Sequence, residues 1–154
     1  MIIRKFQPED LEAILELFYD VVHSVGAKYY DLDQVNAWAP KNSSDKEKWL
    51  QSLTDHITYV AEDKGKIIGF GDMTQTGYID RLYVHKNYQG RGATLAIFRK
   101  LEEEARRLGL TELTTEASIM AKRLEERQGF EVIQEQRKIL RGIEFITYSM
   151  RKKL

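Results

Sequence analysis

The chain has 154 residues, enough for one domain with a hydrophobic core, and we expect a single domain over residues 1–154. Its 24 basic and 24 acidic residues balance, so its charge predicts neither a nucleic-acid partner nor a membrane partner. Cysteine is absent, which excludes disulfides, thiolate metal sites and a cysteine nucleophile. The three histidines lack the spacing of a metal site, so we expect no metal. The sequence has no membrane-length apolar run and no signal-peptide pattern, which predicts a cytoplasmic protein.

Apolar periodicity and turn residues predict an alternation of strands and helices along the chain. In chain order we expect a strand at 1–6, a helix at 8–25, a short helix at 33–38, a helix at 45–53 capped by Ser43 and Ser44, strands at 58–62, 66–73 and 78–84, a long helix before Gly109, a strand at 113–117, a helix at 118–128, and a hairpin of strands at 130–140 and 143–150. The order of the longer elements is β-α-α-β-β-β-α-β-α-β-β. It predicts an α/β fold around a mixed sheet.

The segment from Tyr78 to Gly109 carries the clearest functional pattern. A strand that ends in Leu82-Tyr83-Val84 leads through a polar loop into Gln89-Gly90-Arg91-Gly92-Ala93-Thr94. The helix that follows is expected to bury one face, made of Leu95, Phe98, Leu101, Ala105 and Leu108. Backbone N–H groups and the positive end of a helix dipole meet in such a loop, which is typical of a phosphate-binding site. The loop is neither a Walker motif nor a dinucleotide fingerprint, and a tight turn that requires glycine is the alternative interpretation.

Two segments resemble the GCN5-related N-acetyltransferase (GNAT) family. The glycine loop resembles its motif A, Gln/Arg-x-x-Gly-x-Gly/Ala, through Gln89 and Gly92, with Thr94 in place of the last Gly or Ala. The segment 121–130, Ala-Lys-Arg-Leu-Glu-Glu-Arg-Gln-Gly-Phe, is similar to the family's Ala-x-x-Phe-Tyr-Glu-Lys-x-Gly-Phe. The element order is also that of the family, so the resemblance covers nearly the whole chain. It implies a mixed, mostly antiparallel sheet and acetyl-CoA as co-substrate.

The resemblance also implies where the cofactor is held. The pyrophosphate of acetyl-CoA would bind the backbone amides of the loop residues Gln89, Gly90, Arg91, Gly92, Ala93 and Thr94. Backbone groups of Leu82, Tyr83 and Val84 would bind the pantetheine arm, provided that their strand diverges from the strand at 113–117. The Val84 amide would then stabilise the oxyanion.

Asp80 and Glu116 are the candidate general bases, because each places a charge in a strand that is otherwise largely buried. A salt bridge, for example from Asp80 to Arg81, is the alternative interpretation. The family often has a tyrosine where this chain has Glu125, and that tyrosine protonates the departing thiolate. Unless it is strongly perturbed, Glu125 is ionised near neutral pH and is a poor acid. Without cysteine, we expect direct transfer in a ternary complex.

Tyr29, Tyr30 and Trp38 are predicted to line the acceptor pocket, although aromatic residues in such a segment also serve as core. The leading hypothesis is an N-acetyltransferase that acts on a small-molecule primary amine. A CoA-binding regulatory protein without turnover and a protein acetyltransferase, acting on lysine or an N-terminus, are the alternatives. Dimers are common in the family, so a homodimer is a further expectation.

Overall fold

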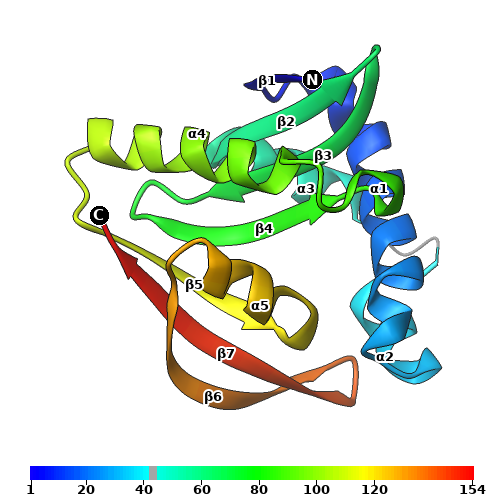
Figure 1. The fold of residues 1–154 in the computed structure, drawn as a ribbon. Helices are drawn as coiled ribbons and strands as arrows, with labels where there is room; N and C mark the ends of the chain where they lie inside the picture. The colour runs from blue at the N-terminus through cyan, green and yellow to red at the C-terminus, as the bar shows by residue number, and fades with distance from the viewer. Residues whose placement is uncertain (42–44) are drawn as a thin grey trace.

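The computed structural model describes residues 1–41 and 45–154. Seven strands form a sheet in the order β1-β2-β3-β4-β5-β7-β6, with helices on both of its faces (Figure 1). The elements are β1 (Ile2–Lys5), α1 (Leu11–Ser24), α2 (Leu32–Trp38), α3 (Lys46–Asp55), β2 (Ile57–Asp63), β3 (Lys66–Met73), β4 (Tyr78–Val84), α4 (Ala93–Arg107), β5 (Glu112–Ser118), α5 (Ile119–Arg127), β6 (Glu131–Leu140) and β7 (Ile143–Lys153). No helix among the described residues has both the length and the apolar character needed to cross a membrane.

The α/β fold with a mixed, mostly antiparallel sheet is confirmed, and the strands follow the predicted order. The short α2 makes a third helix between β1 and β2. The helix expected from Pro8 begins with a 3₁₀ turn, so α1 itself starts at Leu11. The N-cap of α3 is Asp45, whose carboxylate accepts from the Lys48 amide at 3.1 Å. The predicted caps Ser43 and Ser44 lie outside the described residues.

Two hydrophobic clusters hold the helices to the sheet. On one face, α4 packs its buried residues, and Ile97 lies so close to β3 that a Cβ at Gly71 would sit 2.8 Å from it. On the other face, α1, α2 and α3 cover Phe70 and Tyr83. The expected buried face of α4 is wrong at its ends: Leu95 and Leu108 are 40% and 47% exposed. The residues that it buries are Ala93, Ile97, Phe98, Leu101 and Ala105.

The sheet opens between β4 and β5. These two strands are the parallel pair of the sheet, and their register consists of Tyr78 opposite Thr114 and Ile79 opposite Thr115. The Thr115 hydroxyl donates to the Ile79 carbonyl at 2.8 Å, and beyond this point the strands diverge (Figure 1). The divergence starts where β4 carries a bulge. Its pairing with β3 skips from Arg81 to Ile79, which leaves Asp80 as the extra residue.

Candidate active site

The loop Gln89–Thr94 presents backbone amides at the start of α4. Gly92 precedes the first turn of the helix, and no side chain caps that turn. Gly90 and Gly92 have left-handed φ angles of +72° and +87°, which glycine adopts without strain. A Cβ at either position would meet no atom of the described residues within 4 Å, apart from its chain neighbours. The first amides of α4 and the positive end of its dipole therefore face free space, as anion binding requires.

The peptide groups of Leu82 and Val84 face the opening between β4 and β5. Residues of an antiparallel strand alternate between bonding their partner strand and turning their peptide groups to the other side. The His85 amide donates to the Ile68 carbonyl of β3 at 2.8 Å, and the pairing continues in register along β4. The N–H groups of Leu82 and Val84 consequently point away from β3, toward the side that β5 has left. The side-chain amide of Gln89 donates to the Val84 carbonyl and joins the loop to this strand.

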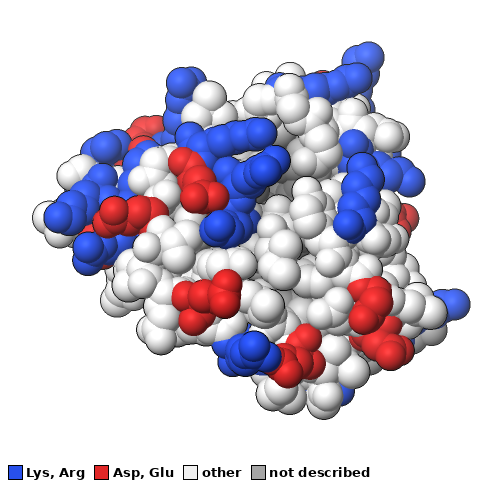
Figure 2. Space-filling view, turned by 60° about the horizontal axis from the view of Figure 1, so that its bottom comes forward, with Lys and Arg blue, Asp and Glu red and all other residues white. Residues whose placement is uncertain are grey.

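A groove of about 240 Å³ connects the glycine loop with the opening. Gln89 and Thr94 line it from the loop, and Leu82 and Val84 line it from β4. From α5 the groove is lined by Arg123, Leu124 and Arg127. Figure 2 views the molecule partly from the side of β6 and β7: Lys and Arg gather in the upper half of this face, and its centre is mainly uncharged.

A narrow slot of about 50 Å³ lies in the opening itself. Asp80 and Leu82 line it from β4, Glu116 from β5 and Glu125 from α5. The Glu116 side chain is half-buried and accepts a hydrogen bond from the Thr147 hydroxyl at 2.7 Å. Both candidate bases thus lie in the wall of one slot.

Glu125 is a buried carboxyl group that forms no ion pair within the described part of the chain. It is 4% exposed, and its Oε2 atom has no hydrogen-bond partner among the described residues. Burial raises the pKa of Glu125 from its ordinary value of 4.5 to about 8. This is the strong perturbation that the expectation for Glu125 left open, and it favours the protonated form of the carboxyl near neutral pH.

Asp80 belongs to a charged cluster that is centred on Asp72 of β3. Asp72 is fully buried and accepts from the Arg81 guanidinium at 2.6 Å and from Nδ1 of His56 at 2.8 Å. The alternative salt bridge of Asp80 exists in a loose form, since its carboxylate lies 3.7 Å from Nε of Arg81 and its side chain is 39% exposed. Partial burial and the negative charge of Asp72 raise the pKa of Asp80.

Sequence reasoning missed Asp72 and His56. Asp72 is a charged residue within the predicted strand 66–73, the same feature that pointed to Asp80. His56 lies at the end of α3, 16 residues away, and the sequence alone does not bring the two together.

The three aromatic residues that were predicted to line the acceptor pocket are not brought into one cavity. Tyr29 is 52% exposed and lines the groove beside the loop, whereas Trp38 lines the slot. The indole of Trp38 donates to the Tyr83 hydroxyl at 3.0 Å. Tyr30 is 7% exposed and packs edge-on against Phe145, so it belongs to the core as the alternative interpretation had it.

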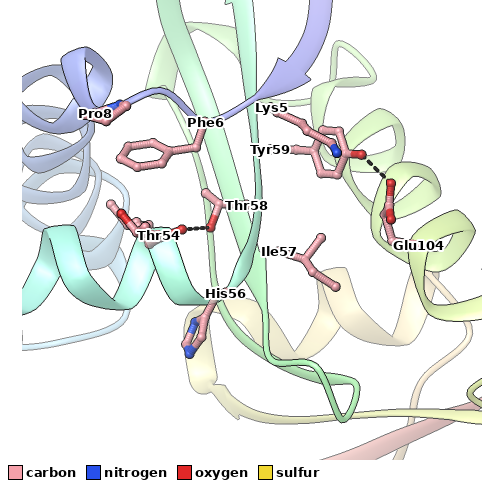
Figure 3. Close-up of a pocket in the computed structure, with 10 residues that line it drawn as sticks. Lys5, Phe6, Pro8, Thr54, His56, Ile57, Thr58, Tyr59 and Glu104 are labelled. Atoms are coloured by element: carbon pink, nitrogen blue, oxygen red, sulfur yellow. Dashed lines mark hydrogen bonds between the residues drawn. The ribbon is translucent and has the colours of Figure 1, made fainter. Parts of the chain in front are cut away.

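A second cavity, of about 290 Å³, lies on the other side of β3 from the slot and is shown in Figure 3. Lys5 lines it from β1, Tyr59 from β2 and His56 from the end of α3. The Tyr59 hydroxyl donates to Glu104 of α4 at 2.7 Å. The glycine loop, β4 and β5 contribute none of its lining residues.

Comparison with known proteins identifies the class to which this architecture belongs. The model of the acetyltransferase (GNAT) domain family matches residues 27–152. The uncharacterized N-acetyltransferase YafP of Escherichia coli (strain K12) is 32% identical over 151 residues, which are 98% of this chain and 95% of YafP. The crystal structure of a GCN5-related N-acetyltransferase from Rhodopseudomonas palustris matches with a TM-score of 0.94 and 28% identity, over 99% of this chain and 95% of that one. PaiA N-acetyltransferase from Thermoplasma acidophilum, solved with coenzyme A, matches with a TM-score of 0.79 and 22% identity, over 99% and 98% of the two chains.

The chain belongs to the GNAT acetyltransferase family. It is an acetyl-CoA-dependent acyltransferase of this type, and the predicted fold and enzyme class are confirmed.

Proposed function

We propose that the protein transfers the acetyl group of acetyl-CoA to the primary amine of a small molecule, by direct attack in a ternary complex. The observation that carries this proposal is the opening between β4 and β5, where the N–H groups of Leu82 and Val84 meet the groove from the glycine loop. Bound acetyl-CoA supplies the acetyl group as a thioester, from which an amine displaces sulfur.

The residues along the groove fit the cofactor from one end to the other. The free space at Gly90 and Gly92 admits the pyrophosphate to the amides of Gln89–Thr94. Arg91 is exposed, with its guanidinium 5.4 Å from the Tyr88 ring, and adds positive charge to the loop. The backbone of Leu82, Tyr83 and Val84 holds the pantetheine arm in place of the β5 strand that has diverged. The Val84 N–H then stabilises negative charge on the reacting carbonyl oxygen.

Different carboxyl groups of the slot act as the base and as the acid of the reaction. Asp80 is the general base for the amine, because it lines the slot and its raised pKa brings its basicity closer to that task. Glu116 lines the same slot and is the second candidate base. Glu125 returns a proton to the departing sulfur, the role that the resemblance assigns to a tyrosine at this position. A carboxyl with a pKa of about 8 is largely protonated near neutral pH and is able to donate.

The narrowness of the slot supports a small acceptor. It holds about 50 Å³, and Trp38 is one of the residues that line it. A primary amine on a slender chain fits such a slot better than a folded protein surface does.

Thiol release from acetyl-CoA over a panel of amines tests the proposal, together with calorimetric binding of coenzyme A. The panel contains small primary amines, lysine-containing peptides and peptides with a free N-terminus. We expect coenzyme A to bind and thiol release to require a small primary amine. Binding without release for any acceptor would indicate a CoA-binding regulatory protein, and release only with peptides would indicate a protein acetyltransferase.

A further inference from the structure

Three titratable side chains form a compact cluster on the α3 side of the slot. His56, Asp72 and Asp80 each place a side-chain nitrogen or oxygen so that all three atoms lie within 4.8 Å of one another. Asp72 and His56 are in direct hydrogen-bond contact at 2.8 Å. Asp80 is separated from the His56 ring by at most the span that one bridging water covers. Asp80, the proposed general base in the slot, is therefore within reach of His56, which lies outside the slot.

Asp72 determines which nitrogen of the neutral His56 ring carries the proton. The buried oxygens of Asp72 also accept hydrogen bonds from the Arg81 guanidinium. Nδ1 of His56 therefore carries a proton and donates it to Asp72, so Nε2 is the unprotonated nitrogen of the neutral ring. No hydrogen bond among the described residues uses Nε2. The hydrogen bond to Asp72 raises the pKa of His56, which makes the ring a competent proton acceptor.

His56 also reaches the second cavity. Its side chain is 20% exposed and lines the cavity of Figure 3, where it stands at the lower edge next to the start of β2. The charged groups around the ring are Asp72, Asp80 and Arg81 in the cluster, with Lys5 and Glu104 in the cavity wall. Glu104 accepts a hydrogen bond from the Tyr59 hydroxyl. His56 belongs to the cluster and also lines the cavity.

The proposed reaction leaves one proton over in each turnover. A protonated amine that becomes an amide loses two protons from nitrogen, while the C–N bond forms and the C–S bond breaks with its electron pair on sulfur. One proton goes from nitrogen to Asp80 and has to leave before the next turnover. The second leaves nitrogen as the tetrahedral intermediate collapses and replaces the proton that Glu125 gives to sulfur. Asp80 is 39% exposed in the free protein, but an acceptor bound in the narrow slot would cover it, so during the reaction this proton needs another way out.

We propose that His56, held by Asp72, is the relay that carries the proton from Asp80 to solvent in the cavity of Figure 3. This inference rests on the proposed function. Asp80 passes the proton through water to the unprotonated ring nitrogen of His56. Asp72 stabilises the positive ring, which then releases a proton to water in the cavity. His56 acts through Asp80 and touches neither substrate, so it is a positioning and relay residue.

His56→Asn tests the relay, because an asparagine amide replaces Nδ1–H toward Asp72 but cannot titrate. We expect turnover to fall roughly tenfold at low buffer concentration, less than the ~100-fold typical of a direct base, since water replaces a relay in part. Imidazole added to the buffer should restore the rate, while coenzyme A affinity stays unchanged. His23→Asn, a matched change on α1 outside the cluster, should show no dependence on imidazole. An imidazole-independent rate in His56→Asn would overturn the relay.

A second measurement does not depend on turnover. Proton NMR of the His56 ring should give a pKa above the ordinary value of histidine, and Asp80→Asn should lower it because a nearby negative charge is lost. An unchanged His56 pKa in Asp80→Asn would show that the two groups are not coupled and would refute the path. If the wild-type protein binds no coenzyme A and releases no thiol, the proposed function fails. If it turns over and His56→Asn behaves like wild type, only the relay fails.

Discussion

Replacing Glu125 by glutamine tests whether a protonated carboxyl is buried beneath α5. The folded-state pKa of Glu125 is about 8 and its ordinary value is 4.5, so between these values the folded protein holds a proton that the unfolded chain has lost. The unfolded state binds fewer protons there, and the free energy of unfolding falls as pH rises, by about 1.4 kcal/mol per pH unit. The stabilising contribution is complete below the unfolded-state pKa and is lost as pH rises through the folded-state pKa.

The magnitude follows from the two pKa values. Between pH 5 and pH 9, ionisation of Glu125 should lower wild-type stability by about 4 kcal/mol relative to Glu125→Gln, which has no proton to lose. Urea unfolding of both proteins across this range measures the difference, and its slope with pH is independent of any packing change in the variant. Glu126→Gln, at an exposed position next in the chain, is the matched control and should run parallel to wild type. A constant difference between Glu125→Gln and wild type over the whole range would refute the buried, protonated carboxyl.

Three further substitutions address the loop, the base and the core. Gly92→Val strains a φ of +87° and places a side chain in the free space at the start of α4. Coenzyme A affinity measured by calorimetry should therefore fall at least ~10-fold. Retained affinity would show that the loop is not part of the site. Asp80→Asn should lower turnover by about 100-fold or more and abolish the fall in rate on the acid side of the pH profile, with coenzyme A affinity unchanged. A wild-type pH profile would leave Asp80 as a partner of Arg81 alone. Gly71→Ala should cost about 1–3 kcal/mol in urea unfolding, because the added Cβ meets Ile97 at 2.8 Å, and an unchanged stability would show that α4 shifts freely.

The sequence predicted the elements well where local patterns determine them. The turn between β2 and β3 places Lys64 and Gly65 at positive φ, as expected for a two-residue hairpin, and β3 and β4 have the predicted bounds. Ser118 caps α5 through the Ala121 amide at 3.2 Å, at the start of the helix predicted over 118–128. The single domain, the cytoplasmic location and the homodimer stay predictions.

The site was less predictable because its chemistry depends on contacts between distant segments. The bulge at Asp80 arises from the register of β4 against β3, which no local pattern in β4 reveals. The His56–Asp72 contact needs α3 and β3 to meet. The protonation state of Glu125 depends on how deeply α5 is buried, and a residue type alone gives only the ordinary pKa.

The environments of the three carboxyl groups impose a direction on the reaction. Asp72 is paired with Arg81 and His56, burial favours the neutral form of Glu125, and Asp80 lies at the bulge with a raised pKa. In the proposed mechanism the proton acceptor therefore lies on the α3 side of the slot and the proton donor on the α5 side. The groove proposed for the cofactor also runs along α5, so we expect the amine to enter from the side of Asp80. An amine that enters there releases its proton toward His56 and away from Glu125. Glu125 then keeps its own proton until sulfur departs.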